Sequence, residues 1–290
     1  MKKIVILGCE NSHADKFLAL IKDNPEFADL SCIGVYTDEL PEAEKLRDKY
    51  GVEILPAYDA AVGQVDGVIV TARHGDNHYK YAKPYIASGV PMFIDKPITA
   101  NPEEAVVFMR ELRDAGVRVT GGSSLRSAPE VLAIAEAHRT EKNGKTVGAA
   151  FRAPLDPDER YGGFWFYSQH LVEMMGECFG RHPRAVQAMR VGIQTTVIFR
   201  YEDFDAVGLF SEKSWQYYVS RFAATGSEGI NVTTRGETWF PAELGAFRDL
   251  LNGSEQTLSY DDFIAPVFVI DAILRALESG KEETVSYVTV

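Results

Sequence analysis

Short apolar runs alternate with longer stretches of helical periodicity through the first 122 residues. Runs that are apolar throughout are typical of parallel strands covered on both faces. The alternation of strands and helices predicts a doubly wound parallel sheet. The expected strands are 4–7, 30–36, 65–71, 91–94 and 118–120, and the expected helices are 12–22, 41–50, 77–88 and 101–115.

Several of these helix boundaries carry capping signals. Ser12-His13-Ala14-Asp15 and Ser259 to Asp262 both have the form of a capping box, in which a hydroxyl and an acid three residues later satisfy backbone N–H groups. Asn101 precedes a proline and two acids, which is a typical helix start. Gly51 and Gly280 are placed to end helices.

The pattern changes after Gly121-Gly122, where strand-like stretches follow one another at the spacing of an antiparallel meander. The expected strands are 146–152, 190–201, 205–210, 215–225 and 230–234, and the expected helices are 129–139, 165–178, 241–251 and 261–278. The sequence therefore predicts an α/β protein with two domains. Residues 1–122 form a Rossmann-type domain, and residues 123–290 form a C-terminal α+β domain with an open, largely antiparallel sheet.

Charge and composition narrow the class of protein. The formal net charge is -12 and no basic run interrupts it, which argues against a nucleic-acid partner. No apolar stretch is long enough to span a membrane. Cys9, Cys32 and Cys178 lie far apart, which is typical of free thiols in a reducing compartment, and we expect a cytoplasmic protein.

The topology itself indicates where a ligand binds. In a doubly wound sheet, ligands lie beyond the carboxyl ends of the strands. The segments Gly8 to His13, Tyr36 to Glu39, Thr71 to His78 and Asp95 to Pro97 all follow expected strands. We therefore expect these four segments to converge on one ligand site.

Three of the motifs have a familiar form. Phe93-Ile94-Asp95-Lys96-Pro97 is a strand that ends in Asp-Lys-Pro, and Thr71 leads to His78 after the preceding strand. In the second domain, Gly162-Gly163 leads through an aromatic segment to His170 and Glu173. In their order, these motifs resemble the glucose–fructose oxidoreductase / inositol dehydrogenase / MocA family, whose typical members move a hydride between NAD(P) and a sugar or cyclitol.

The resemblance implies roles for individual residues. Lys96 and His170 would be catalytic and handle the proton of a substrate hydroxyl. A homodimer or homotetramer and a small polyol or sugar substrate are also implied. The implied cofactor-binding residues are Gly8, Glu10, Asn11, Ser12, His13, Asp38, Thr71, His74, His78, Asp95 and Pro97. The implied substrate residues are Arg126, Trp165, Tyr167 and Glu173, and no metal site is expected.

The chain also departs from the family pattern. The family's Gly-x-Gly-x-x-Gly fingerprint reads Gly8-Cys9-Glu10-Asn11-Ser12-His13 here, so only the first glycine is kept. Glu10 puts a negative charge where a glycine normally lets the backbone approach a pyrophosphate. Phe166 stands where many members have an acid four residues before the histidine. Asp38 favours NAD over NADP, because an acid after the second strand disfavours the extra phosphate.

Each candidate has a structural alternative. Lys96 could pair with Asp95, and His170 could be a buried histidine satisfied by the backbone. Glu173 lies one helical turn after His170 and could orient its ring or pair with an arginine. His74 could cap a helix, Asp38 could be a solvated turn acid, and Arg126 could meet a carboxylate. Trp165 has the character of a core residue, since aromatics at such positions are more often buried.

The leading functional hypothesis is an NAD(P)-dependent oxidoreductase acting on a sugar, cyclitol or related polyol. One alternative keeps the fold without redox chemistry, as a small-molecule binding or regulatory protein, and is favoured by Glu10 and the missing glycines. Another is a lyase or hydrolase that uses tightly bound NAD. Lys96 and His170 favour chemistry over simple binding.

Overall fold

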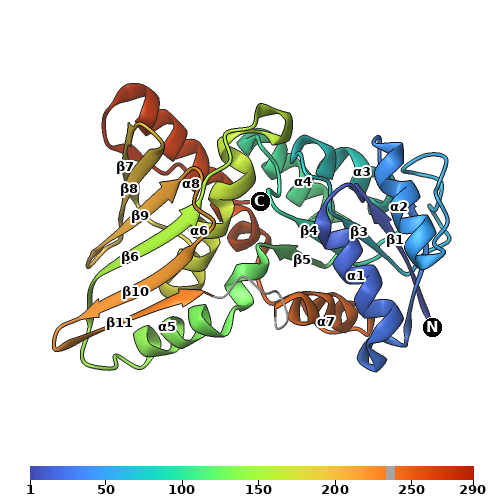
Figure 1. The fold of residues 1–290 in the computed structure, drawn as a ribbon, viewed down its shortest axis with the longest axis horizontal. Helices are drawn as coiled ribbons and strands as arrows, with labels where there is room; N and C mark the ends of the chain where they lie inside the picture. Colours follow the sequence, from blue (N-terminus) through green and yellow to red (C-terminus); the bar gives the residue numbers. More distant parts are fainter. Residues whose placement is uncertain (233–238) are drawn as a thin grey trace. The chain divides into compact units, whose positions relative to one another are not determined.

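The computed structural model describes residues 1–232 and 239–290 and divides the chain into two units (Figure 1). The first unit comprises Met1–Gly122, Phe240–Phe263 and Val290. The second unit comprises Ser123–Trp239 and Ile264–Thr289. The segment Phe240–Phe263 therefore lies with the first unit, whereas the sequence pattern grouped it with the second domain.

The first unit is built on the predicted parallel sheet. Every neighbouring pair of its strands is parallel, in the order β2-β1-β3-β4-β5. The strands are β1 (Lys2–Leu7), β2 (Leu30–Tyr36), β3 (Gly67–Val70), β4 (Met92–Asp95) and β5 (Val119–Gly122). The last three strands in this order are buried at every residue, as expected for a sheet covered on both faces. β1 is buried over its last four residues, and the edge strand β2 at three of its seven.

Helices alternate with these strands, and one more comes from late in the chain. Leu244, Phe247 and Leu251 of that late helix, α7 (Trp239–Leu251), share one core cluster with Ile4, Phe17 and Phe93. Because these side chains supply part of the apolar core, α7 is an integral part of the first unit. The other helices are α1 (Ser12–Asp23), α2 (Leu40–Tyr50), α3 (Asp76–Ile86) and α4 (Pro102–Asp114), with a 3-10 turn at Pro25–Phe27.

Two of the three predicted N-terminal helix caps are confirmed. The Asn101 side chain accepts hydrogen bonds from the backbone of Glu103 and Glu104. Ser259 and Asp262 form a capping box at the start of α8 (Tyr260–Ser279). The capping box expected at Ser12 is wrong. The N-cap of α1 is Asn11, which caps no backbone N–H because both ends of its side chain are engaged elsewhere. Its amide donates to Asp95, and its Oδ1 atom accepts from the Ser12 hydroxyl at 3.4 Å.

The second unit has a seven-stranded sheet in the order β11-β10-β6-β9-β8-β7-β12. Only β6 and β9 pair in parallel, and the other neighbours are antiparallel, which confirms the predicted mixed sheet. Its strands are β6 (Thr146–Pro154), β7 (Ala185–Val191), β8 (Gln194–Arg200), β9 (Asp205–Ser211), β10 (Tyr217–Ala223), β11 (Gly226–Val232) and β12 (Glu283–Thr284). Its helices are α5 (Pro129–Arg139), α6 (Phe164–Phe179) and most of α8, with 3-10 turns at Ser124–Ser127 and Glu159–Tyr161.

One predicted strand is two strands in the structure. The stretch 190–201 covers the end of β7 and all of β8, which pair as a hairpin around Gly192. Gly192 has a φ of 58°, a left-handed conformation that suits a tight turn. The last predicted strand, 230–234, overlaps the end of β11, and Thr233 and Thr234 lie outside the described residues.

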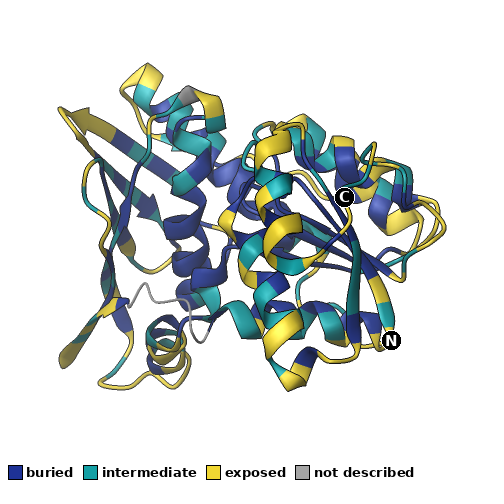
Figure 2. Cartoon of the chain, turned by 45° about the vertical axis from the view of Figure 1, so that its right-hand side comes forward, coloured by how far each residue is buried: buried dark blue, intermediate teal, exposed yellow. Residues whose placement is uncertain are grey.

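Burial differs between the two units (Figure 2). In the first unit, the sheet strands form a continuous buried layer. In the second unit, several large apolar side chains on strands or on the β7–β8 turn are exposed, namely Val147, Met189, Val191, Ile193 and Phe222. Across the described residues, we find no helix with the length and apolarity needed to cross a membrane.

Candidate active site

The loop after β1 begins with a glycine that cannot be replaced freely. Gly8 has a φ of 77°, and a Cβ atom there would lie 2.4 Å from backbone atoms of Ala72, after β3. The Thr71 hydroxyl donates to the Gly8 carbonyl at 3.0 Å. Only a residue without a side chain allows the β1 and β3 ends to approach this closely.

Glu10 replaces the second glycine of the fingerprint, and its carboxylate is held by protein donors. The side chain is buried and accepts a hydrogen bond from the Thr37 hydroxyl at 2.7 Å and from the Arg73 backbone N–H at 2.9 Å. Thr37 follows β2, and Arg73 follows β3. Since β1 lies between these strands, Glu10 links the two strand ends that flank its own.

Asp95, the last residue of β4, is the centre of a buried polar cluster. Its side chain has no exposed surface and is bonded to the Asn11 amide at 3.0 Å and to Nδ1 of His13. It also accepts from the Lys96 backbone N–H at 2.7 Å. The His13 ring lies between Phe17 and Phe240, at 6.0 and 5.1 Å between ring centroids. Two residues that replace fingerprint positions therefore hold Asp95 in place.

Lys96 follows in a turn that contains a cis peptide bond to Pro97. Its side chain is 4 % exposed, and burial lowers the pKa of the ammonium to about 8. The negative charges of Asp95 and Glu243 raise that pKa in part, while the positive charge of Arg73 lowers it. Such a group exchanges protons near neutral pH, which an exposed lysine does not.

Asp38 lies after β2 in a cluster of tyrosines, apart from the Asp95 cluster. Its carboxylate accepts from the Tyr36 hydroxyl at 2.6 Å and from the Tyr81 hydroxyl at 2.9 Å, and Lys80 lies 3.5 Å away. The Tyr36 hydrogen bond holds the pKa of Asp38 below its usual range. The side chain is exposed, and it makes hydrogen bonds to two tyrosine hydroxyls and lies close to Lys80.

Two histidines that follow β3, His74 and His78, make hydrogen bonds with backbone groups. His78 is fully buried, with Nε2 at 2.8 Å from the Ala72 carbonyl and Nδ1 at 3.3 Å from the Ile98 carbonyl. Burial lowers the pKa of His78, which favours the neutral ring, and a neutral imidazole carries one N–H and so donates to one of these two carbonyls. His74 accepts from the Asp76 backbone N–H at the start of α3, the capping role that the sequence left open.

His170, on α6 in the second unit, is buried and tied to the start of that unit. Its Nδ1 lies 2.6 Å from the Ser123 hydroxyl. Glu173 accepts from the Ser123 backbone N–H at 2.8 Å and from the Gln169 amide at 2.6 Å. Glu173 therefore positions the histidine indirectly, by fixing the residue that contacts its ring.

Glu173 also has the arginine partner that the sequence left as an alternative. Nη1 of Arg181 lies 3.5 Å from its second oxygen, and both side chains are buried. A buried carboxylate needs such compensation, because an unpaired charge away from water is costly. Glu173 thus both bonds to the residue that contacts the His170 ring and pairs with an arginine.

Aromatic rings surround His170. Tyr167 and Tyr217 each lie 5.7 Å from the imidazole between centroids, and Tyr167 also contacts Trp215 at 5.2 Å. Trp165 lies in the first turn of α6 and Arg126 in a 3-10 turn, and both side chains are half-buried. Tyr167 is therefore the implied substrate residue that the structure brings to His170 directly.

The remaining thiols and acids do not suggest another kind of site. Burial raises the pKa of Cys9 and of Cys32 to about 12, and the Cys178 thiol is shifted the same way. All three thus remain protonated and pack as apolar groups. Within residues 1–232 and 239–290, no group of three or more histidine, cysteine or acidic side chains could hold a metal ion.

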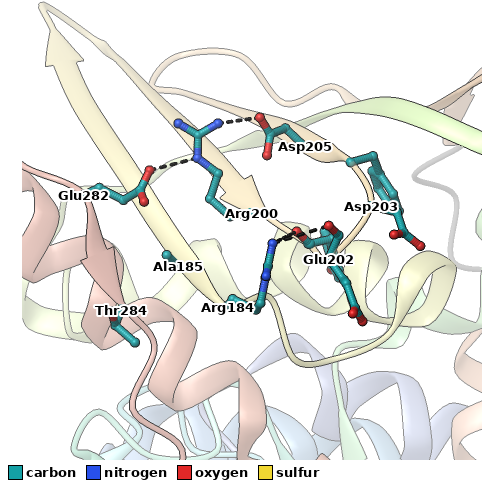
Figure 3. A pocket seen from close by; sticks show the side chains of 10 residues that line it. Arg184, Ala185, Arg200, Glu202, Asp203, Asp205, Glu282 and Thr284 are labelled. Atoms are coloured by element: carbon teal, nitrogen blue, oxygen red, sulfur yellow. Dashed lines mark hydrogen bonds and ion pairs between the residues drawn. The ribbon is translucent and has the colours of Figure 1, made fainter.

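A hollow of about 560 Å³ at the edge of the second unit's sheet is lined by paired charges (Figure 3). Arg200 bonds to Glu282 at 2.8 Å and to Asp205, and Arg184 donates to the Tyr201 carbonyl at 2.9 Å. No residue implied by the sequence motifs lines it. Its arginines are bound to acids and to a backbone carbonyl at the strand ends. We therefore do not count this hollow as a candidate site beside the Lys96 and His170 clusters.

Sequence reasoning missed several supporting residues. Ser123 could have been found, because it directly follows the glycine pair that ends the last Rossmann strand. Arg181 lies only eight residues after Glu173 and could have been considered as its partner. Glu243 carries no local signal, since it is far in sequence from Lys96. Thr37 and Arg73 were hidden for the same reason, although both follow strands of the parallel sheet.

A known family matches the first unit of the chain. Residues 2–123 match the Gfo/Idh/MocA model, described as an oxidoreductase family with an NAD-binding Rossmann fold. The Rossmann segment is therefore similar to this oxidoreductase family. No curated protein matches the chain.

Solved structures share the fold over the whole chain at low identity. A myo-inositol dehydrogenase from Corynebacterium glutamicum is 17% identical, with a TM-score of 0.84 over 99% of this chain and 100% of that one. The scyllo-inositol dehydrogenase from Lactobacillus casei, bound to NAD(H) and scyllo-inositol, is 15% identical, with a TM-score of 0.85 over 98% and 99%. The chain therefore shares the fold of these inositol dehydrogenases over both of its units.

Proposed function

We propose that this protein is an NAD-dependent dehydrogenase of the Gfo/Idh/MocA family that oxidises a hydroxyl group of a cyclitol, sugar or related polyol. The observation that carries the proposal is Lys96, a buried lysine with a pKa near neutrality at the carboxyl end of β4, in a domain of an NAD-binding oxidoreductase family. The inositol dehydrogenases of the same fold support the substrate class.

The residues after β1 and β2 fit a dinucleotide. The first turn of α1 has no side-chain cap, so its N–H groups suit a pyrophosphate, while the Glu10 carboxylate is bound by Thr37 and Arg73. Asp38 would accept from the adenosine ribose, and its negative charge disfavours the additional phosphate of NADP. When bound, NAD supplies the hydride acceptor for the oxidation.

The proton chemistry falls to the chain's own side chains. As a neutral amine, Lys96 can accept the proton of a substrate hydroxyl, and Asp95 beside it stabilises the resulting ammonium. We assign His170 to proton transfer as well, held by Ser123 and Glu173. Tyr167, Trp165 and Arg126 are the proposed substrate contacts. The three free thiols are typical of a reducing compartment, so a cytoplasmic location remains our prediction.

The test is a calorimetric titration of the purified protein with NAD(H) and NADP(H), after a check for co-purified nucleotide. We expect NAD(H) to bind more tightly than NADP(H), and Asp38→Asn to reduce the difference. A screen of cyclitols and sugars then follows nicotinamide absorbance, with Lys96→Ala and His170→Ala as inactive variants that keep the fold. If neither dinucleotide binds and none co-purifies, the dehydrogenase proposal fails and a small-molecule binding role replaces it.

A further inference from the structure

A third carboxylate, beyond Asp95 and Asp38, enters the first unit from α7. The inner face of this helix packs on β4, where Phe247 lies 6.5 Å from Phe93 between ring centroids. Two turns earlier on the same side, Phe240 contacts the ring of His13, which is bonded to Asp95. The start of α7 therefore contacts the cluster next to Lys96.

Glu243 lies one helical turn after Phe240 and shares its face, since residues three apart on a helix are neighbours. Its side chain is only 5 % exposed. Burying a carboxylate is costly unless positive charge compensates it, so a glutamate kept at such a position indicates a cationic neighbour. The charge of Glu243 acts on Lys96.

We propose that Glu243 is a positioning residue of the Lys96 site, which balances the charge of the lysine and strengthens its hold on a proton taken from the substrate. This inference rests on the proposed function of Lys96 as a proton acceptor. Three charged groups set the state of the lysine: Asp95 from its own turn, Arg73 from the loop after β3, and Glu243 from α7.

The consequence is chemical. Burial and the charge of Arg73 both favour the neutral amine of Lys96, whereas Asp95 and Glu243 favour the ammonium. Of these two acids, only Asp95 belongs to the Rossmann segment itself. Without Glu243, the amine would be a weaker base and would hold a substrate proton less well. The second acid therefore sets the base strength of Lys96 without contacting the substrate.

The experiment follows the titration of Lys96 itself. Protein labelled with 13C-lysine is titrated by NMR at Cε, and the Lys96 signal is assigned by its absence in Lys96→Arg. We expect Glu243→Gln to raise the fraction of neutral Lys96 at pH 7 roughly three- to fivefold. Glu243→Asp should stay close to the wild type, because it keeps the charge. Asp249→Asn, on the exposed side of the same helix, is the matched control and should change nothing.

Glu243→Met provides a second neutral variant of similar volume, in case the glutamine variant does not fold. A Lys96 titration that matches the wild type in either folded variant overturns the inference. The measurement needs no dinucleotide and no substrate, so its result is independent of the binding test above. If the protein binds NAD and oxidises a polyol while Lys96 titrates unchanged, only the role of Glu243 is lost.

Discussion

At the scale of single residues, the side chains that replace the glycine-rich loop make specific contacts with neighbouring strand ends. Asn11 and His13 occupy positions of the family fingerprint, and both contact Asp95, the residue before Lys96. Glu10 binds the ends of the neighbouring strands. In place of glycines, the loop thus has side chains whose hydrogen bonds connect the carboxyl ends of the strands.

Gly8 is the fingerprint glycine that this chain keeps, and the structure leaves no room for a side chain there. We expect Gly8→Ala to lower the free energy of unfolding by about 3 kcal/mol, because the alanine combines a strained φ with overlap against Ala72. Gly51→Ala is the control, since its φ is 72° and a Cβ there meets nothing within 4 Å. That variant should lose about 1 kcal/mol. Urea unfolding measures both, and equal losses would contradict the packing argument.

Lys96 also predicts a pH dependence for the proposed oxidation. The neutral amine is the base, and it becomes populated as the pH rises through its pKa of about 8. We therefore expect kcat/KM for polyol oxidation to rise about tenfold per pH unit below this value and to level off above it. The profile is measured at saturating NAD. A flat profile would exclude Lys96 as the base.

The residues that the sequence placed best are those whose roles are local. Asp95, Lys96 and Pro97 could be placed because they stand at the end of a recognisable strand. Ser12 was assigned as a cap because the sequence cannot show that Asn11 has a buried partner 84 positions away. Glu243 was beyond reach, since nothing near it in sequence reveals its coupling to Lys96.

At the scale of elements, helix starts provide a matched pair for stability. Ser259 caps α8 by accepting from the Asp262 backbone, whereas Ser12 makes no such bond in α1. We expect Ser259→Ala to cost about 1 kcal/mol of unfolding free energy and Ser12→Ala to cost much less. Thermal and urea unfolding of both variants give the comparison. A larger loss for Ser12→Ala would restore the capping box that the sequence pattern suggested.

Strands and helices with clear periodicity were predictable, and the exceptions have physical causes. The hairpin of β7 and β8 was taken as one strand because Gln194 to Arg200 continues the alternation of β7 across a two-residue turn. The helix at 241–251 was predicted correctly, yet its place in the first unit was not. An amphipathic pattern shows that a helix buries one face, but it does not name the sheet that receives it.

At the scale of the whole molecule, the exposed apolar side chains of the second unit predict self-association. Met189 and Val191 on β7 are 57% and 75% exposed. Large apolar side chains gathered on one sheet mark an interaction surface, and we expect a homodimer or homotetramer.

Light scattering at micromolar concentration tests this assembly. We expect the doubly substituted Met189→Lys, Val191→Lys protein to shift toward the monomer mass. Leu132→Lys, at an exposed apolar position on α5 of the same unit, should leave the mass unchanged. A monomer mass for the unaltered protein would refute the prediction outright.

The crossing of the chain between units has a consequence for biosynthesis. The first 122 residues leave the ribosome without Phe247 and Leu251, which complete their core. The second unit still lacks Ile264–Thr289, which includes β12, when the other six strands of its sheet have been translated. The first unit cannot complete its core before Phe240–Phe263 has been translated, and the second cannot do so before Ile264–Thr289 has been translated. Because synthesis runs from the N-terminus, both cores are still incomplete when the strands up to β11 have been made.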